Sequence, residues 1–232
     1  MNRIGMLAYL GVIAVFLSVI HWGNRAITTA VEEQPIRNRT CIVLDAGHGG
    51  VDGGATSCTG KLESSFNLEI SLRLRDLFHL LGYDTKMIRT TDTSVYTKGE
   101  TIAEKKVSDL KERVRMVNET EKGILVSIHQ NTFSDGKYSG AQVFYGREGE
   151  SKRLADQMQE ALVTTLNSSS NRKAKRADGI YLMENIKCTG VLIECGFLSN
   201  PEEEGKLRTQ DYQKQLCCAI ATEVIKFICN QI

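Results

Sequence analysis

Three apolar, strand-like runs of this chain each stop at or just before a residue that can bind a metal or carry a proton, namely His48, His129 and Glu194. In an open α/β sheet, ligands collect at the carboxyl ends of the strands, so these side chains are expected to meet at one edge. Two imidazoles and a carboxylate are a ligand set that zinc accepts while one position stays free for water. A further carboxylate can move a proton of that water. The pattern predicts a zinc hydrolase.

Strand-like runs alternate with stretches of helical periodicity along the chain. Strands are expected at 41–45, 84–89, 124–128, 141–145, about 180–183 and 191–195. Helices are expected at about 63–81, 105–121 and 149–167 and within 201–230. Such alternation predicts a single α/β domain, in which helices cover both faces of a mainly parallel or mixed central sheet.

The N-terminal segment is typical of export. Seventeen uncharged, mostly apolar residues run from Ile4 to Ile20. At about 1.5 Å per residue they span roughly 25 Å, which suits either a signal peptide or a short membrane anchor. A buried core helix is the alternative, but no polar face interrupts the run. We assign residues 1–30 to this segment, 31–40 to a linker and 41–232 to an exported catalytic domain that contacts the membrane only through its N-terminus.

Composition argues against several classes of protein. Residues 1–30 contain two basic residues and no acid, so the remaining chain has 27 basic and 28 acidic residues. This balance does not indicate nucleic-acid binding. Seven cysteines in an exported chain would suggest disulfides, but the odd number leaves at least one free. Apolar surroundings, as at Cys41, Cys195, Cys217, Cys218 and Cys229, favour buried thiols instead.

The glycine-rich loop 47–54 does not fit a nucleotide-binding motif. A dinucleotide fingerprint would need a glycine at Asp52, and no Gly-Lys-Ser/Thr phosphate loop is present. The glycines favour a sharp turn that keeps bulk away from a ligand, although a simple turn is the alternative. Glu63 lies at the start of the next expected helix, where the helix dipole favours an ionised carboxylate. Asn67, one turn later, is placed to orient Glu63.

Each of the other candidates also has a structural interpretation. His129 on its own is equally typical of a core histidine whose hydrogen bonds are satisfied. A glutamate such as Glu194 at the end of a buried strand is costly unless it has a role or a partner. His79, on the expected helix 63–81, is interpreted as structural or exposed.

Several motifs together resemble the zinc-dependent N-acetylmuramoyl-L-alanine amidases. They are Asp45–Gly50 (Asp-Ala-Gly-His-Gly-Gly), Glu63-x-x-x-Asn67, Ser127–Asn131, Glu194–Asn200, Arg89–Asp92, Arg113–Asn118 and Ser139–Gly140. The likeness covers nearly all of residues 41–230 in family order and implies the amidase (phosphorylase/hydrolase-like) α/β fold. With the export segment and no wall-binding module, the chain is most similar to the germination-specific, spore-cortex branch of that family.

The resemblance implies one Zn²⁺ ion held by His48, Glu63 and His129, with water in the fourth position. Glu194 would take a proton from that water as it attacks the amide between N-acetylmuramic acid and L-alanine, and would then protonate the departing amine. The implied partner is peptidoglycan, in the cell wall or spore envelope, with an accessory protein as a further candidate partner. In the cortex, the stripped muramic acid would be the precursor of muramic lactam.

Two departures from the family pattern concern substrate contacts rather than the metal. Cys188-Thr189-Gly190 stands where the family often has proline and a small residue, and the basic segment 171–176 lacks the usual glycine after its arginine. Asn131, Arg172 and Lys175 are candidates to support the site or to meet the substrate, a solvated loop being the alternative for the two cations.

Two other classes of protein remain open. One is a metal-free module that uses the same fold to bind peptidoglycan. The other is a zinc hydrolase of a different amide, although the chain has no His-Glu-x-x-His motif of the familiar metalloprotease helix.

Overall fold

The computed structural model describes residues 40–166 and 170–230. The predicted export segment 1–30 and nearly all of the predicted linker lie outside the described residues. The part that is described forms an α/β domain beginning at Thr40. Within it, no helix is both long and apolar enough to cross a lipid bilayer.

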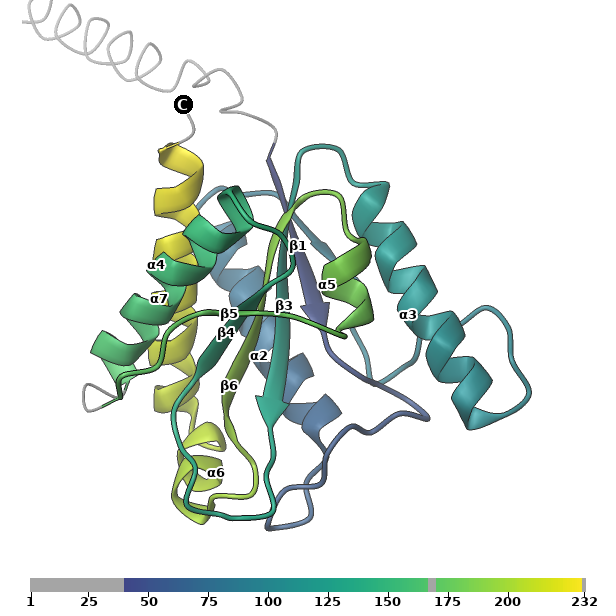
Figure 1. Cartoon of the computed structure of the whole chain (residues 1–232), viewed down its shortest axis with the longest axis horizontal. Coiled ribbons are helices and arrows are strands. Elements are labelled where there is room, and N and C mark those ends of the chain that lie inside the picture. Colours follow the sequence, from purple (N-terminus) through teal and green to yellow (C-terminus); the bar gives the residue numbers. More distant parts are fainter. Residues whose placement is uncertain (1–39, 167–169, 231–232) are drawn as a thin grey trace, which may run out of the picture. The chain divides into compact units, whose positions relative to one another are not determined.

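A mixed sheet of six strands forms the centre of the described domain (Figure 1). The strands are β1 (Cys41–Ala46), β2 (Thr85–Met87), β3 (Gly123–Asn131), β4 (Gln142–Tyr145), β5 (Lys175–Arg176) and β6 (Thr189–Phe197). Their spatial order is β2-β1-β3-β6-β4-β5. The pairs β1–β2, β1–β3, β3–β6 and β4–β5 are parallel, whereas β4 runs antiparallel to β6. The predicted fold class is confirmed.

Helices cover both faces of this sheet. They are α2 (Glu63–Leu80), α3 (Ile102–Asn118), α4 (Glu150–Leu166), α5 (Tyr181–Asn185), α6 (Pro201–Leu207) and α7 (Gln210–Cys229). Helices α2, α4 and α7 enclose the larger apolar core on one face, and α3 and α5 pack over a smaller core on the other (Figure 1). The helices predicted at 63–81 and 149–167 agree with α2 and α4 within the described residues.

The prediction of a strand near 180–183 is wrong, because these residues enter α5. A strand would turn alternate side chains to opposite faces, yet the consecutive residues Leu182 and Met183 are both buried in the smaller core. One helical turn allows both to pack there. The structure also contains the two-residue edge strand β5, in a segment for which a connection was predicted.

Strand β3 shows how the fold places chemistry at one edge. Ile124, Val126 and Ile128 pack into the larger core, and Leu125 packs into the smaller one. Because side chains alternate along a strand, the side chain of His129 lies on the same face of the sheet as Leu125, the face that α3 and α5 cover. His129 is near the carboxyl end of β3. The parallel strands β1 and β6 end at the same edge.

Candidate metal centre

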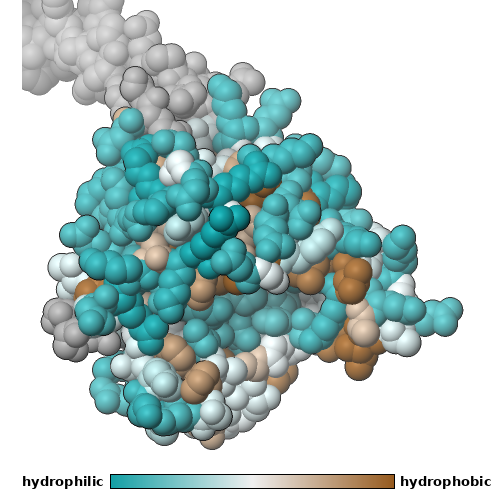
Figure 2. All heavy atoms as spheres, in the orientation of Figure 1, coloured by the Kyte–Doolittle hydropathy of each residue, from teal (hydrophilic) through white to brown (hydrophobic). Residues whose placement is uncertain are grey.

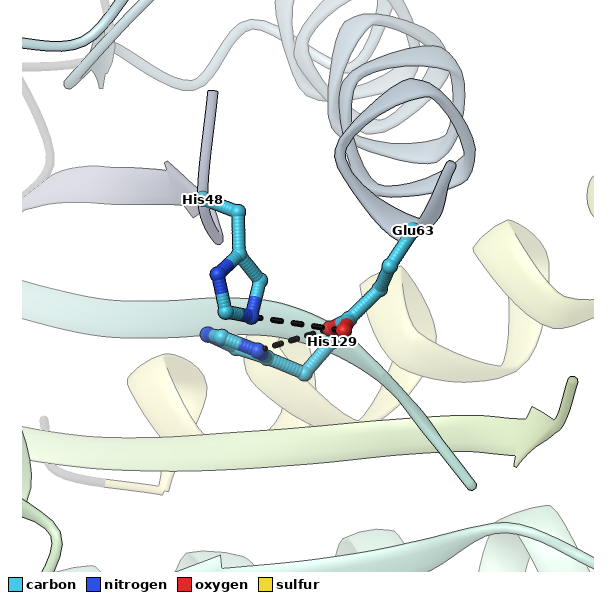
Figure 3. Close-up of side chains that lie close together, drawn as sticks. All are labelled: His48, Glu63 and His129. Atoms are coloured by element: carbon cyan, nitrogen blue, oxygen red, sulfur yellow. Dashed lines mark hydrogen bonds and ion pairs between the residues drawn. The ribbon is translucent and has the colours of Figure 1, made fainter. Parts of the chain in front are cut away.

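His48, Glu63 and His129 converge just beyond the strand ends (Figure 3). Glu63 comes from the first turn of α2, and its two carboxylate oxygens face different imidazoles. Oε2 lies 3.3 Å from Nε2 of His48, and Oε1 lies 3.0 Å from Nδ1 of His129. The three groups that sequence reasoning placed together are brought together by the structure.

The glycine-rich turn after β1 is shaped by these side chains. A Cβ atom on Gly47 would lie only 2.2 Å from Nε2 of His129, so the imidazole ring fills the space that a larger residue would need. Gly54, at φ +69°, has a backbone conformation that L side chains rarely adopt, and a Cβ there would lie 2.6 Å from Oε2 of Glu63. His48 itself has φ 60°, a sparsely populated region for a non-glycine residue.

Neighbouring polar groups orient the three side chains. The Nδ1–H of His48 donates to Oδ2 of Asp52 at 3.0 Å, which leaves Nε2 facing the site. The side-chain amide of Asn67 donates to Oε1 of Glu63 at 3.2 Å, and it also donates to the carbonyl of Gly47. The predicted contact between Asn67 and Glu63 is present. Asp52 was missed as a functional candidate, although the position of a carboxylate four residues after the histidine was a usable signal.

The charges of the cluster favour an ionised Glu63. Burial alone would raise the pKa of this carboxyl, but hydrogen bonds and charges from His129 and His48 hold it well below its usual range. For His48, burial lowers the pKa, whereas the hydrogen bonds to Glu63 and Asp52 raise it to about 9. A cation that binds here therefore displaces imidazole protons, as metal binding to histidine requires.

The donor set fits zinc. Two ligands that each lie about 2.1 Å from a tetrahedral ion are about 3.4 Å apart. The nitrogen–oxygen separations of 3.0 and 3.3 Å are close to that value, and all three ligand atoms lie within 4.8 Å of one another. Two histidines and a carboxylate are also the protein ligands of catalytic zinc sites that keep a fourth position open.

Glu194 stands beside this cluster on the neighbouring strand. It is paired in register with His129 and lines the same cavity of about 300 Å³. Its Oε2 atom is buried and has no hydrogen-bond partner among the described residues. Burial, together with the charge of Glu63, raises the pKa of Glu194 to about 7 against the opposing effect of the imidazoles. A carboxyl with such a pKa can both accept and donate a proton near neutral pH.

The opposite side of the cavity is apolar and has one cation at its rim. Leu110 of α3, with Ile180 and Leu182 at α5, forms the apolar side, and Lys106 stands at the rim. The amino group of Lys106 pairs with Oδ1 of Asp52 at 2.8 Å. A larger hollow of about 750 Å³ lies between α4 and α7, but its lining contains none of the predicted site residues.

Two buried arginines donate hydrogen bonds to the backbone of the glycine-rich turn after β1. Arg113 of α3 donates to the carbonyls of Ala46 and His48 and pairs with Asp45, which is almost fully buried. Burial would raise the pKa of Asp45, but the guanidinium of Arg113 holds it below its usual value. Arg89 donates to the carbonyls of Ala46 and Gly47. These contacts give physical reasons for the arginines in the family motifs.

The remaining predicted residues have different surroundings. Asn131 ends β3 two residues after His129, on the same face of the sheet. Arg172 lies over the ring of Phe197 at 5.2 Å, and Lys175 is exposed on the edge strand β5, outside the cavity lining. His79 forms a hydrogen bond with Thr85, as a structural residue would.

All seven cysteines lie within the described residues and are unpaired. Cys195 and Cys217 are buried, in agreement with their interpretation as small hydrophobic residues. Cys218 and Cys229 are exposed and Cys41 is half-buried, so the prediction of core positions is wrong for these three. On α7, the face that carries Cys218 and Cys229 points away from the core, because α7 buries only one side.

The fold and the site are those of a hydrolase of the α/β class with a cluster that could hold a metal ion. Residues 42–226 match the family described as N-acetylmuramoyl-L-alanine amidase (Amidase_3), so the chain belongs to this family. The germination-specific N-acetylmuramoyl-L-alanine amidase of Bacillus subtilis is 40% identical over 189 residues, which are 80% of this chain and 78% of that relative.

Solved structures agree with this assignment. The CwlD amidase from Clostridioides difficile, determined in complex with the GerS lipoprotein, is 37% identical with a TM-score of 0.78 and matches over 83% of this chain and 99% of its own. An N-acetylmuramoyl-L-alanine amidase from Clostridium difficile 630 is 29% identical with a TM-score of 0.70, over 81% and 95% of the two chains.

Proposed function

We propose that this protein hydrolyses the amide bond between N-acetylmuramic acid and L-alanine in peptidoglycan, with one zinc ion held by His48, Glu63 and His129. The observation that carries the proposal is the His–Glu–His cluster beside Glu194, whose Oε2 atom has no hydrogen-bond partner in the described part of the chain. A buried polar atom without a partner costs free energy, and a substrate or a water molecule would supply the missing contact.

Zinc, when bound, would polarise the scissile carbonyl and acidify the attacking water. Glu194 takes the proton from that water and passes it to the nitrogen of L-alanine as the carbon–nitrogen bond breaks. Asp52 and Asn67 hold His48 and Glu63 in place throughout. The products are a glycan strand that bears a bare muramic acid and a free stem peptide.

The test is mass spectrometry of purified muropeptides after digestion with the full-length protein. We expect a free stem peptide and a glycan product that is lighter by the mass of that peptide minus one water, together with one zinc per chain and loss of turnover when a chelator removes the zinc. Products cut at a peptide bond would mean a hydrolase of another amide, and binding without products would mean a metal-free module.

A matched variant separates the ligand role from a core role of the same histidine. His129→Ala should remove zinc and activity together and leave a folded domain, whereas His79→Ala, a change on α2 at the Thr85 contact, should keep both. Full zinc occupancy and turnover in His129→Ala would overturn the ligand assignment.

We also infer a place for this activity in maturation of the spore cortex, where the stripped muramic acid becomes the precursor of muramic lactam. The support is the 40% identity to a germination-specific amidase. Spores that lack the protein should contain no muramic lactam in their cortex muropeptides. Normal lactam content in such spores would contradict the cortex role.

An accessory protein is proposed as a partner. The support is that a similar amidase was solved in complex with the GerS lipoprotein. Affinity purification of the full chain from sporulating cells, followed by mass spectrometry, should recover a stoichiometric partner that raises the amidase rate. Full activity of the chain alone, with no stoichiometric partner, would exclude this requirement.

A further inference from the structure

A cluster of aromatic rings lies beyond the carboxyl end of the sheet. Phe133 and Tyr138 meet edge to face with ring centroids 4.8 Å apart, and Tyr138 stacks on Phe197 at 6.2 Å. Phe133 is 53% exposed and Tyr138 is 39% exposed, whereas Phe197 is buried beneath them. We call these three residues the aromatic shelf. Figure 2 shows apolar side chains at the lower end of the molecule, where Figure 1 places the loop between β3 and β4.

The aromatic shelf is on the same face of the sheet as the catalytic carboxylate. In the pairing of β3 with β6, His129 is opposite Glu194 and Asn131 is opposite Phe197. The step from His129 to Asn131 is two residues, whereas the step from Glu194 to Phe197 is three. The extra residue forms a bulge in β6, and because of it Phe197 lies on the same face of the sheet as Glu194. At about 3.3 Å per residue, Phe197 is roughly 7–10 Å along the strand from Glu194.

The loop that carries the shelf is held at several points. Ser199 accepts a hydrogen bond from the backbone N–H of Phe133 at 3.1 Å, and the side-chain amide of Asn200 donates to the carbonyl of Tyr138 at 3.2 Å. The guanidinium of Arg172 lies over Phe197. The exposed rings thus stand on a fixed backbone, and little conformational freedom is lost when a ligand binds.

We propose that the aromatic shelf binds the glycan strand of the substrate, with sugar rings stacked on Phe133 and Tyr138 next to the scissile amide. This inference rests on the proposed function. A fixed, exposed aromatic surface is typical of a binding site, and its flat faces match the C–H faces of pyranose rings. The stem peptide has carboxylates and no ring, so it fits better on the other side of the cavity, where Lys106 and the apolar side chains stand.

The glycan then occupies the β6 side of the cavity and the peptide occupies the side of α3 and α5. Arg172, a candidate either to support the site or to meet the substrate, has a supporting role in this arrangement. Its Nε donates to the carbonyl of Ser139 at 3.1 Å and its side chain covers Phe197. It stabilises the shelf rather than reaching for the peptide.

The test compares two substrates with the same peptide, one a D-lactyl peptide without sugar and the other a tetrasaccharide muropeptide. The zinc-loaded full chain should prefer the tetrasaccharide in KM. Phe133→Leu keeps apolar bulk but removes the flat ring, so it should raise KM for the tetrasaccharide about tenfold, with kcat and the rate on the lactyl peptide unchanged. Phe133→Trp should restore the preference.

Leu80→Ala is the matched control, because it removes an apolar side chain that is 82% exposed at the C-terminal end of α2. It should change the kinetic constants for neither substrate. Binding of a peptide-free tetrasaccharide, measured by calorimetry, should weaken in Phe133→Leu and not in the control. If Phe133→Leu keeps both the preference for the tetrasaccharide and the binding of the peptide-free tetrasaccharide, the aromatic shelf does not bind the glycan. An equal loss of kcat/KM on both substrates would also contradict the proposal. Failure of the wild-type chain to cleave either substrate, both alone and with the partner recovered from sporulating cells, would overturn the proposed amidase activity itself.

Discussion

Glu194 is assigned the transfer of protons, and its neighbours offer a direct test. Glu194→Gln keeps the size of the side chain and removes the proton-transfer function. Such functions contribute roughly 10²–10⁴ in rate, so turnover should fall by about that factor while zinc content stays at one per chain. Zinc stoichiometry, melting temperature and amidase rate are measured on one preparation. Near-normal turnover of a folded, zinc-loaded variant would mean that another residue transfers the proton.

The pH dependence of the reaction follows from the same carboxyl. Burial raises the pKa of Glu194 to about 7, and a bound cation would lower it. Because a general base must be ionised, kcat/KM has its full value above this pKa and falls as the pH drops through it. The acid limb of the pH profile should therefore lie at or below pH 7. The profile is measured with zinc content determined at each pH. A rate that stays flat at every acidic pH at which the zinc remains bound would contradict the assignment.

A substitution of Asp52 tests how much the hydrogen-bond partner of His48 contributes to zinc affinity. Its carboxylate accepts the Nδ1–H of His48, and loss of such partners typically reduces metal affinity about 10–100-fold. Asp52→Ala should show this reduction in zinc competition with a chelator. Asp76→Ala, which removes an exposed partner of Arg75, is the control and should bind zinc normally. Equal zinc affinities in the two variants would mean that Asp52 does not support the metal site.

The sequence predicted which residues meet, but not how they are oriented. His129 and Glu194 were predictable because parallel strands end at one edge and both residues end apolar runs. Asp52 was signalled only by its spacing of four residues from His48, and its contact with the imidazole depends on the left-handed turn at His48, which the sequence did not predict. The role of Arg113 depends on α3 crossing below this turn, a tertiary contact without a local signal.

Helix α3 is anchored to β1 by a charge pair that burial makes important for stability. Asp45→Ala would leave the buried Arg113 with Asp109 as its remaining acidic partner, so the loss should lie near the lower end of the roughly 3–5 kcal/mol that breaking a buried pair costs. Urea unfolding should show this loss. Arg115→Ala on the same helix removes the surface pairs of an exposed guanidinium with Glu112 and Glu119 and should cost much less. Similar losses in both variants would show that the buried pair has no special role.

The limits of helices were predicted less well than their existence. The predicted helix 105–121 begins three residues earlier, at Ile102, because Thr101 and Glu104 form a reciprocal capping box. A cap signal was thus present in the sequence at Thr101, four residues before the predicted start of the helix. Helix α5 has only five residues, too few for periodicity to distinguish a strand from a helix, so tertiary packing decided its form.

The order of the strands determines which residues meet at the site. Three parallel strands, β1, β3 and β6, bring His48, His129 and Glu194 to one edge, and α2 adds Glu63 from the layer behind. The antiparallel strand β4 follows the loop that carries the aromatic shelf. Because β4 runs antiparallel to β6, it begins at Gln142 opposite Glu194, and the loop that precedes β4 meets the sheet at this point.

We propose that the chain is exported, because its proposed substrate lies outside the cytoplasmic membrane, and that residues 1–30 direct this export. The apolar run 4–20 carries no charge, and charged residues at the centre of such a run oppose insertion by about 2.5–3.5 kcal/mol each. A phosphatase reporter that is active only after export, fused after residue 232, should therefore be active. Replacing Leu10 and Val15 by Asp should abolish its activity, while Glu32→Gln, in the proposed linker, should not. A fused reporter that works only in the cytoplasm would place the domain on the wrong side of the membrane and contradict the proposed topology.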